Sequence, residues 1–149
     1  MNMAHPYLTF DGNTEEAFRY YAGVFGVEMA GIMRYRDFGG NPMGVPDDEL
    51  DKIAHVALPL GKNTLMGTDV LRADAGAFRL GTNVAILLDA DGPDEADHLF
   101  EGLSAGGHVE MALQETDWAE KYGMCTDKFG VPWMVNYEGG KRFALGHAD

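Results

Sequence analysis

The sequence contains an internal repeat, which constrains its fold more than any other feature. Two segments with helical periodicity, 14–25 and 93–105, each place Glu-Ala before a pair of apolar or aromatic residues. Each segment is followed by the same four residues, Val27-Glu28-Met29-Ala30 in the first half and Val109-Glu110-Met111-Ala112 in the second. Matched segments in the same order indicate a duplication. Because a half of this size buries a sheet face poorly on its own, we expect the two halves to pack together.

Each half is predicted to contain a strand, a helix and three further strands. Apolar and β-branched runs bounded by turn residues indicate the strands, and an apolar stripe indicates each helix. In the first half these elements are predicted at 7–10, 14–25, 29–36, 53–60 and 64–68. In the second half they are predicted at 84–88, 93–105, 109–114, 124–127 and 131–137, with a short helical turn at 118–122.

The ends of the helices carry recognisable signals. Asn13 is expected to cap the first helix, with Glu16 completing a capping box, and Gly26 is expected to end it. Pro93 suits the first position of the second helix.

Length and charge exclude several classes of function. The 149 residues are expected to form a single domain, with a first module at about 5–70 and a second at about 82–140. A net charge of −13 repels phosphate backbones and anionic membranes, so we expect neither nucleic acid nor a membrane as partner. The start of the chain is not expected to be a signal peptide. Cys125 is the only cysteine, which excludes an internal disulfide and favours a cytoplasmic location.

Several motifs carry a family resemblance. In the first half they are Pro6-Tyr7-Leu8-Thr9-Phe10-Asp11-Gly12-Asn13, Ala17, Tyr20-Tyr21, Ile53-Ala54-His55, Leu65-Met66 and Asp69. In the second half they are Gln114-Glu115-Thr116, Trp118 and Thr126-Asp127-Lys128-Phe129-Gly130-Val131-Pro132-Trp133-Met134-Val135-Asn136. From about residue 5 to 140, the chain resembles the PhnB-like branch of the vicinal oxygen chelate superfamily. That superfamily includes glyoxalase I, extradiol dioxygenases and bleomycin-resistance proteins.

The resemblance implies an α+β fold of two βαβββ modules in one domain, whose curved mixed sheets form an open cup, and it implies a homodimer. Proteins of this branch have often been labelled demethylubiquinone methyltransferases. The sequence argues against that activity, because the chain is short for such an enzyme. It also begins without a Gly-rich nucleotide-binding turn between a strand and a helix.

In metal-dependent members of the superfamily, the first and fourth strands of the modules supply His, Gln or Glu ligands to one divalent metal. When these ligand positions are transferred to this sequence by the register of its helices and turns, they are occupied by Pro6, Met66, Ala85 and Met134. None of these side chains is a suitable ligand, and the neighbours within one or two residues are His5, Asn83 and Asn136. We therefore expect no bound metal and no cofactor.

His55 has two interpretations. It lies in mid-strand, where it is either a cup-facing general base or ligand hydrogen-bonder, or a buried histidine satisfied by a backbone carbonyl or a carboxylate. His98, His108 and His147 are expected to be solvent-exposed, and Cys125 is expected to be a buried thiol rather than a nucleophile.

Methionine and aromatic residues predict an apolar, adaptable pocket that suits a flat organic molecule better than a chelated metal. Its candidate lining residues are Phe10, His55, Met66, Trp118, Met134 and Asn136. For Phe10 and Met66, simple core packing is an equal alternative. Trp133 is expected to pack in the core, because its neighbour Met134 should face the cup.

The long loop at 37–51 contains an acidic run, Asp47-Asp48-Glu49 with Asp51. We expect a solvated segment, with a lid or a dimer-contact arm as the alternative.

These observations favour a protein that binds a small organic molecule in an apolar cup without a metal. The alternative is a metal-dependent lyase, isomerase or dioxygenase with His5 or His55 in its site. A third possibility is a purely structural dimer. Whether the chain is an enzyme stays open at this point.

Overall fold

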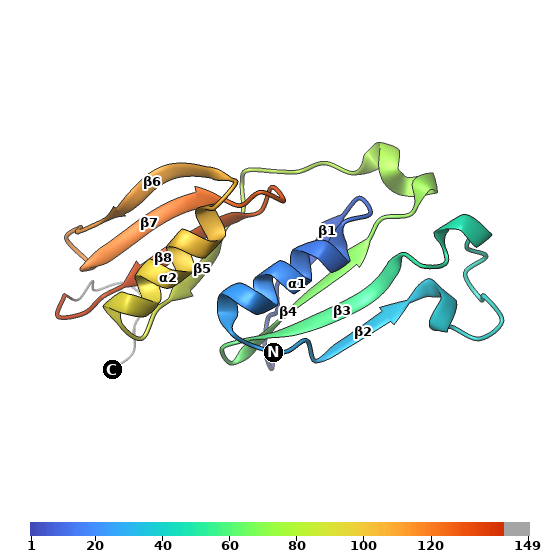
Figure 1. Cartoon of the computed structure of the whole chain (residues 1–149), viewed down its shortest axis with the longest axis horizontal. Coiled ribbons are helices and arrows are strands. Elements are labelled where there is room, and N and C mark those ends of the chain that lie inside the picture. The colour runs from blue at the N-terminus through green and yellow to red at the C-terminus, as the bar shows by residue number, and fades with distance from the viewer. Residues whose placement is uncertain (142–149) are drawn as a thin grey trace. The chain divides into compact units, whose positions relative to one another are not determined.

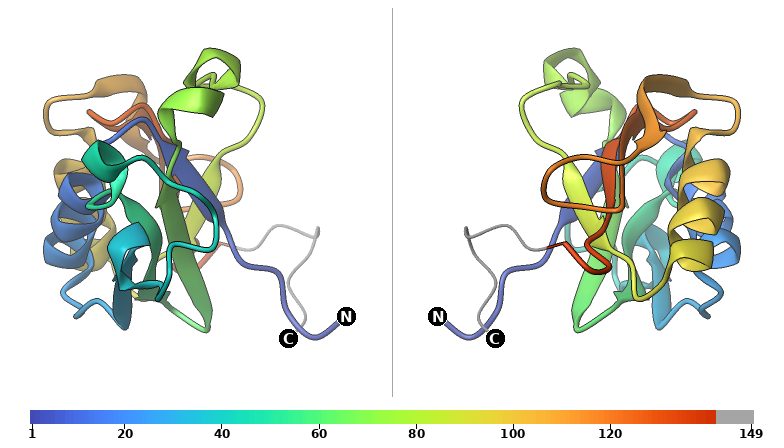
Figure 2. Two further views of the ribbon diagram at one scale, coloured as in Figure 1. Left: turned by 90° about the vertical axis from the view of Figure 1, so that its right-hand side faces the viewer. Right: turned by 90° about the vertical axis from the view of Figure 1, so that its left-hand side faces the viewer.

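The computed structural model describes residues 1–141, so His147 lies outside the described residues. Its contacts divide the chain into two compact units, Met1–Arg79 and Leu80–Asp149. Each unit consists of a four-stranded mixed sheet with one α-helix packed on one face (Figures 1 and 2). No helix within residues 1–141 is long and apolar enough to cross a membrane.

The first unit contains β1 (Tyr7–Phe10), α1 (Thr14–Phe25), β2 (Gly31–Arg34), β3 (Ile53–Leu60) and β4 (Asn63–Asp69). Its strands lie in the order β1-β4-β3-β2. β1 and β4 are parallel, and the other neighbouring pairs are antiparallel.

The second unit contains β5 (Ile86–Asp89), α2 (Pro93–Ser104), β6 (His108–Gln114), β7 (Lys121–Thr126) and β8 (Pro132–Tyr137). Its order, β5-β8-β7-β6, repeats that of the first sheet, with the same parallel and antiparallel pairings. The predicted α+β fold with two βαβββ modules is therefore confirmed, and the two repeated helices occupy equivalent places.

A glycine in each sheet allows the helix to pack closely. In the first unit, a Cβ on Gly67 of β4 would lie 2.6 Å from the ring of Phe18 in α1. In the second, a Cβ on Gly123 of β7 would lie 2.8 Å from the ring of Phe100 in α2. Both contacts identify the side of the sheet that faces the helix. We call the opposite side of each sheet its helix-free face.

The start of α1 differs from the expected capping box. Asn13 makes no capping hydrogen bond to the described residues. Instead Oδ1 of Asp69, at the end of β4, accepts hydrogen bonds from the backbone N of Thr14 at 3.1 Å and from its Oγ1 at 2.6 Å. Asn13 does occupy the predicted cap position, but the predicted capping box is absent, and a carboxylate distant in sequence accepts from the first helical N–H. The predicted end of α1 is confirmed, since Gly26 adopts a left-handed conformation with φ of 65°.

Two predicted segments have other local structures. The helical turn at 118–122 is wrong: Trp118 lies in a bend, and the N–H of Glu120 donates to the carbonyl of Tyr137, so this segment leads into β7. The repeated tetrapeptide forms part of β6 in the second unit, whereas Val27–Ala30 precedes β2 as irregular backbone. Sequence identity over four residues did not fix their conformation, because strand pairing depends on the neighbouring chain.

The acidic run of the long loop is only partly solvated. Asp47, Asp48 and Asp51 are exposed, but Glu49 is only 2 % exposed. Its Oε1 accepts hydrogen bonds from the backbone N of Arg72 at 2.7 Å and from Nζ of Lys52 at 2.8 Å. The expectation of a solvated run is therefore wrong for Glu49, which ties the loop to the segment after β4.

Candidate functional site

The helix-free face of the first sheet presents one row of paired residues across all four strands. Tyr7 of β1 pairs with Met66 of β4, Met66 with Ala57 of β3, and Ala57 with Gly31 of β2. These residues alternate with Gly67, which faces α1, so they point away from the helix. His55, two residues before Ala57 on the same strand, lies on the same face.

Tyr7 and His55 form a hydrogen-bonded pair on this face. The Oη atom of Tyr7 lies 3.1 Å from Nδ1 of His55, and the ring centroids are 5.7 Å apart. Because β4 separates β1 from β3, the tyrosine reaches across the strand that carries Met66. Partial burial, and then the neighbouring Tyr35, raise the pKa of Tyr7, so its phenol keeps its proton at neutral pH.

Phe10 lies on the other side of the same sheet. It is two residues beyond Leu8, which pairs with Gly67 on the α1 face, and only 2 % of its surface is exposed. The structure therefore places Phe10 in the core beneath α1 and does not bring it to the face that carries His55 and Met66.

The helix-free face of the second sheet carries an equivalent row made of apolar side chains. Leu87 of β5 pairs with Met134 of β8, Met134 with Met124 of β7, and Met124 with Met111 of β6. Met134 therefore has the same place in its sheet as Met66 has in the first. Three thioethers lie side by side across three strands. Sequence reasoning found Met134 but missed Met111 and Met124, although strand alternation from Cys125 and Trp133 was the available signal.

Trp118 joins this row through a residue that the sequence did not single out. The Tyr122 hydroxyl donates to Sδ of Met134 at 3.4 Å, and the Trp118 ring packs edge-on against Tyr122 with centroids 5.2 Å apart. Trp118, Tyr122 and Met134 thus form a continuous contact chain.

Asn136 lies two residues beyond Met134, on the same face. Its Nδ2 donates to Oδ1 of Asp89 at 3.0 Å, and the side chain is buried. The Asn136 Oδ1 atom has no hydrogen-bond partner among the described residues. A buried acceptor without a donor costs free energy, so this oxygen is suited to a water or a ligand donor.

A pocket of about 290 Å³ opens beside the methionine row. Its lining includes the segment 82–85, Met124, Thr126, Pro132 and Met134. Glu110 also lines this pocket, and its carboxylate accepts a hydrogen bond from the Thr126 hydroxyl at 2.7 Å. The pocket thus combines a thioether wall with one anchored carboxylate.

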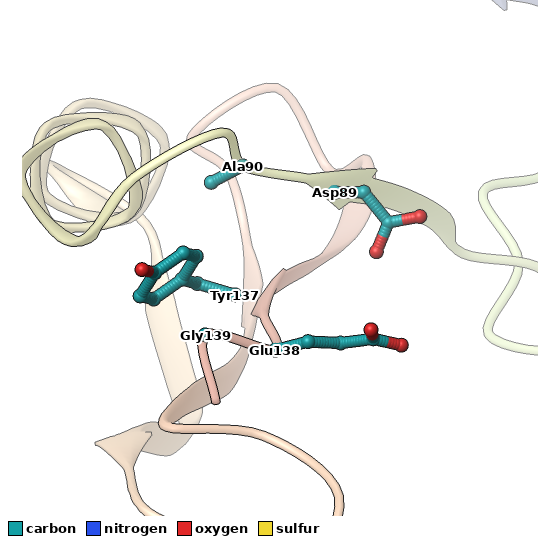
Figure 3. Close-up of a pocket in the computed structure, with 5 residues that line it drawn as sticks. All are labelled: Asp89, Ala90, Tyr137, Glu138 and Gly139. Atoms are coloured by element: carbon teal, nitrogen blue, oxygen red, sulfur yellow. The ribbon is translucent and has the colours of Figure 1, made fainter. Parts of the chain in front are cut away.

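A second, more polar pocket of about 220 Å³ lies at the ends of β5 and β8. Figure 3 shows Asp89 and Glu138 extending to one side of the backbone and Tyr137 to the other. Ala90 and Gly139 complete its lining. It contains carboxylates but little apolar surface to hold an organic molecule.

The motif that most resembles the family, residues 126–136, has a structural explanation in its first half. Asp127 is buried and accepts hydrogen bonds from the backbone N of Phe129 at 2.8 Å, from the backbone N of Val131 at 3.0 Å and from Nε1 of Trp133 at 2.8 Å. Gly130 completes the turn with φ of 90°. Asp127 therefore fixes the β7–β8 turn and holds Trp133 in the core, where it was expected.

Cys125 is buried, as the sequence suggested. Burial, followed by the charges of Glu110 and Asp127, raises the pKa of its thiol to about 11. A thiol that stays protonated is a poor nucleophile.

The positions that hold metal ligands in metal-dependent relatives do not fit a divalent ion here. Pro6 and Ala85 offer no donor atom, and the thioethers of Met66 and Met134 are weak ligands for such ions. Nδ1 of nearby His5 already accepts a hydrogen bond from the backbone N of Thr64 at 2.9 Å. Within residues 1–141, no three His, Cys, Asp or Glu side chains are grouped so that they could hold a metal ion.

Comparison with known proteins identifies relatives across most of the chain. A family model described as 3-demethylubiquinone-9 3-methyltransferase matches residues 2–136. Protein YjdN of Escherichia coli K12 is 33% identical over 142 residues, which cover 88% of this chain and 92% of YjdN.

Solved structures agree with this match. The crystal structure of protein PA1353 from Pseudomonas aeruginosa is 37% identical, with a TM-score of 0.78 over 93% of this chain and 98% of PA1353. A PhnB protein from Bacillus cereus, described as a putative 3-demethylubiquinone-9 3-methyltransferase, shares the fold at 23% identity, with a TM-score of 0.71 over 91% of this chain and 99% of that protein. The chain therefore belongs to the family described as 3-demethylubiquinone-9 3-methyltransferase.

Proposed function

We propose that the protein binds a small organic molecule against the methionine row of the second sheet, without a metal. The observation that carries this proposal is the pocket of about 290 Å³ beside Met124 and Met134. This volume is close to the lower end of the range of ligand pockets, about 300–1,000 Å³. It suits a molecule of one or two fused rings.

The side chains of the pocket support an apolar, planar ligand. Thioethers are polarisable and adapt their rotamers, so a row of methionines can fit ligands of different outline. Trp118 and Tyr122 extend this apolar surface through their contact with Met134. Glu110 and Thr126 supply a polar edge that can orient a ligand bearing a hydrogen-bond donor.

The chemistry of the donor atoms supports binding without a metal. Met66 and Met134 occupy equivalent places in the two sheets, where metal-dependent relatives carry oxygen or imidazole ligands. Replacing such ligands with thioethers removes both the charge and the hard donors that a divalent ion requires.

The methyltransferase activity in the family description has no support in the strand-to-helix turns. The β1–α1 turn, residues 11–13, and the β5–α2 turn, residues 90–92, each contain a single glycine. Neither has the Gly-rich form that cradles a nucleotide-derived cofactor at the start of a helix. Binding of an organic molecule, rather than methyl transfer, is therefore the function we propose.

The test uses N-phenyl-1-naphthylamine, an uncharged fluorescent probe of apolar pockets, with chelator-treated full-length protein. We expect saturable binding that Met134→Glu weakens by about tenfold or more, because a carboxylate in the pocket must be desolvated. Met134→Leu, which keeps the apolar volume, should bind as well as the unaltered protein. Met43→Glu, on an exposed loop residue, is the control for added charge and should have no effect.

Two results would overturn this proposal. One is the absence of saturable probe binding. The other is near one equivalent of Ni, Zn, Fe or Mn per chain in protein purified without chelator or affinity tag, lost in His5→Ala or His55→Ala. That second result would favour the alternative function, a metal-dependent lyase, isomerase or dioxygenase.

We propose further that the chain works as a homodimer in the cytoplasm. Edge strand β6 exposes the apolar side chain of Val109, which pairing with a second copy would cover. The buried, reduced Cys125 suits a reducing compartment. Light scattering should give twice the chain mass of 16.2 kDa, and a particle of 16.2 kDa would contradict the dimer.

A further inference from the structure

We propose that Tyr7 and His55 form a recognition site, on the helix-free face of the first sheet, for the acceptor oxygen of a planar organic molecule. The chemical class is an aryl carboxylate or an aryl ketone, and the shared feature is an exposed carbonyl-type oxygen beside a flat apolar body. This inference rests on the proposed function for the class of ligand, and it adds a separate polar site in the first unit.

The hydrogen bond between the two side chains leaves one donor available. Oη of Tyr7 lies 3.1 Å from Nδ1 of His55. In the proposed site the phenol, which retains its proton, is the donor of this hydrogen bond. A neutral imidazole that accepts at Nδ1 carries its own proton on Nε2. Within residues 1–141, His55 makes no other hydrogen bond, so its Nε2–H can donate to a ligand oxygen.

The surface beside the pair is apolar and is formed partly by small residues. Met66 lies between Tyr7 and Ala57 in the row that crosses the sheet, and Gly31 ends that row on β2. No heavy atom lies within 4 Å of where a Cβ on Gly31 would be, so the space above the β2 end of the row is open. Met33, which pairs with His55, is 39 % exposed and borders this space. A flat ring can rest on Met66 and Ala57 while its oxygen reaches His55.

The fixed geometry of the pair favours specific recognition of a ligand oxygen over a non-specific contact between the ligand and the surface. Tyr7 spans an entire strand to reach His55, and their hydrogen bond orients the imidazole. A donor that is already oriented loses less entropy when a ligand binds. In the second sheet Leu87 lies where Tyr7 lies in the first, so the hydroxyl of the pair is missing there and this polar site belongs to the first unit.

The experiment follows the nitrogen signals of His55 by NMR in full-length protein with ¹⁵N-labelled histidine. The free protein should show the Nε2–H tautomer at His55. Titration with benzoate, and separately with acetophenone, should shift the Nε2 signal to saturation. Benzamidine, which has a similar outline but only donors, should not shift it.

Variants test whether ligand binding depends on the Tyr7–His55 pair or on the protein surface in general. Tyr7→Phe keeps the ring but removes the donor, and it should weaken benzoate binding about tenfold. His55→Gln should weaken it by at least as much. His108→Gln, at an exposed histidine on β6, is the matched control and should leave binding unchanged.

The outcomes are distinct. The inference is overturned by an Nδ1–H tautomer at His55, by an Nε2 signal that neither acceptor ligand moves, or by equal binding to Tyr7→Phe. Saturation by benzoate alone assigns the site to carboxylates, and saturation by acetophenone alone assigns it to neutral carbonyls. If N-phenyl-1-naphthylamine binds metal-free protein while the Nε2 signal of His55 does not shift, the inference fails but the proposed function stands. If the Nε2 signal shifts with benzoate or acetophenone while that probe does not bind, the inference stands but the proposed function fails.

Discussion

Asp69 at the end of β4 caps α1 by accepting two hydrogen bonds from Thr14, one from its backbone N and one from its hydroxyl. Its other carboxylate oxygen accepts a hydrogen bond from the backbone N of Ile53, the first residue of β3, at 2.8 Å. One buried side chain thus joins the start of the helix to two strands, and the first unit depends on it.

Replacing Asp69 with Ala should destabilise the chain by about 2–4 kcal/mol, because buried donors at Thr14 and Ile53 lose their acceptor. Urea unfolding followed by circular dichroism measures this loss. Asp74→Ala, which removes an exposed carboxylate from the loop after β4, is the matched control and should change stability by less than about 0.5 kcal/mol. Equal effects of the two substitutions would show that Asp69 has no special role.

Glu49 should make the stability of the loop depend on pH. The hydrogen bond from Lys52, and then that from the backbone N of Arg72, lower the pKa of Glu49 below its ordinary value of 4.5. A carboxyl whose folded pKa is depressed stabilises the fold fully above the unfolded pKa, and that contribution is lost as the pH falls through the folded pKa.

The measurement compares the free energy of unfolding of the unaltered chain and Glu49→Gln across pH. The stability difference should be largest near neutral pH and should shrink as the pH falls below about 4.5. Asp47→Asn, at an exposed position of the same acidic run, should show no such dependence. A difference that stays constant with pH would contradict this role of Glu49.

Cys125 should be unreactive in the folded chain. With a thiol pKa of about 11, roughly one thiol in a thousand is ionised at pH ~8, and the side chain is also buried. A thiol reagent such as 5,5′-dithiobis(2-nitrobenzoate) should therefore label the native protein far more slowly than the urea-unfolded protein. Native labelling at the unfolded rate would show that Cys125 is accessible and activated.

The repeat made the fold predictable, whereas the site depends on contacts between distant residues. Both helices and the succession of elements in each half follow from periodicity and from matched segments, and the family resemblance implied the α+β class. The capping of α1 by Asp69 was missed because that carboxylate lies at the far end of the module in sequence. Glu49 was expected in solvent because an acidic run looks solvated until its partners, such as Arg72, are known.

The candidate residues were found where strand alternation was clear. His55, Met66 and Met134 lie on helix-free faces because each follows the period of two within a well-defined strand. Phe10 was ambiguous because β1 is short, and its burial beneath α1 is settled only by the pairing of Leu8 with Gly67. The link between Tyr7 and His55 could not be predicted, since it requires knowing that β4 lies between their strands.

Gly67 and Gly23 give a matched pair of substitutions with opposite expected signs. A Cβ on Gly67 would lie 2.6 Å and 2.8 Å from two ring carbons of Phe18, whose side chain is completely buried and cannot move aside. Gly67→Ala should therefore cost about 1–3 kcal/mol. Gly23 lies in α1, and a Cβ added there would have no heavy atom within 4 Å, so Gly23→Ala should stabilise the helix by about 0.5–1 kcal/mol. Thermal and urea unfolding of both variants measure the two changes. If Gly67→Ala is as well tolerated as Gly23→Ala, the close packing of α1 on β4 is wrong.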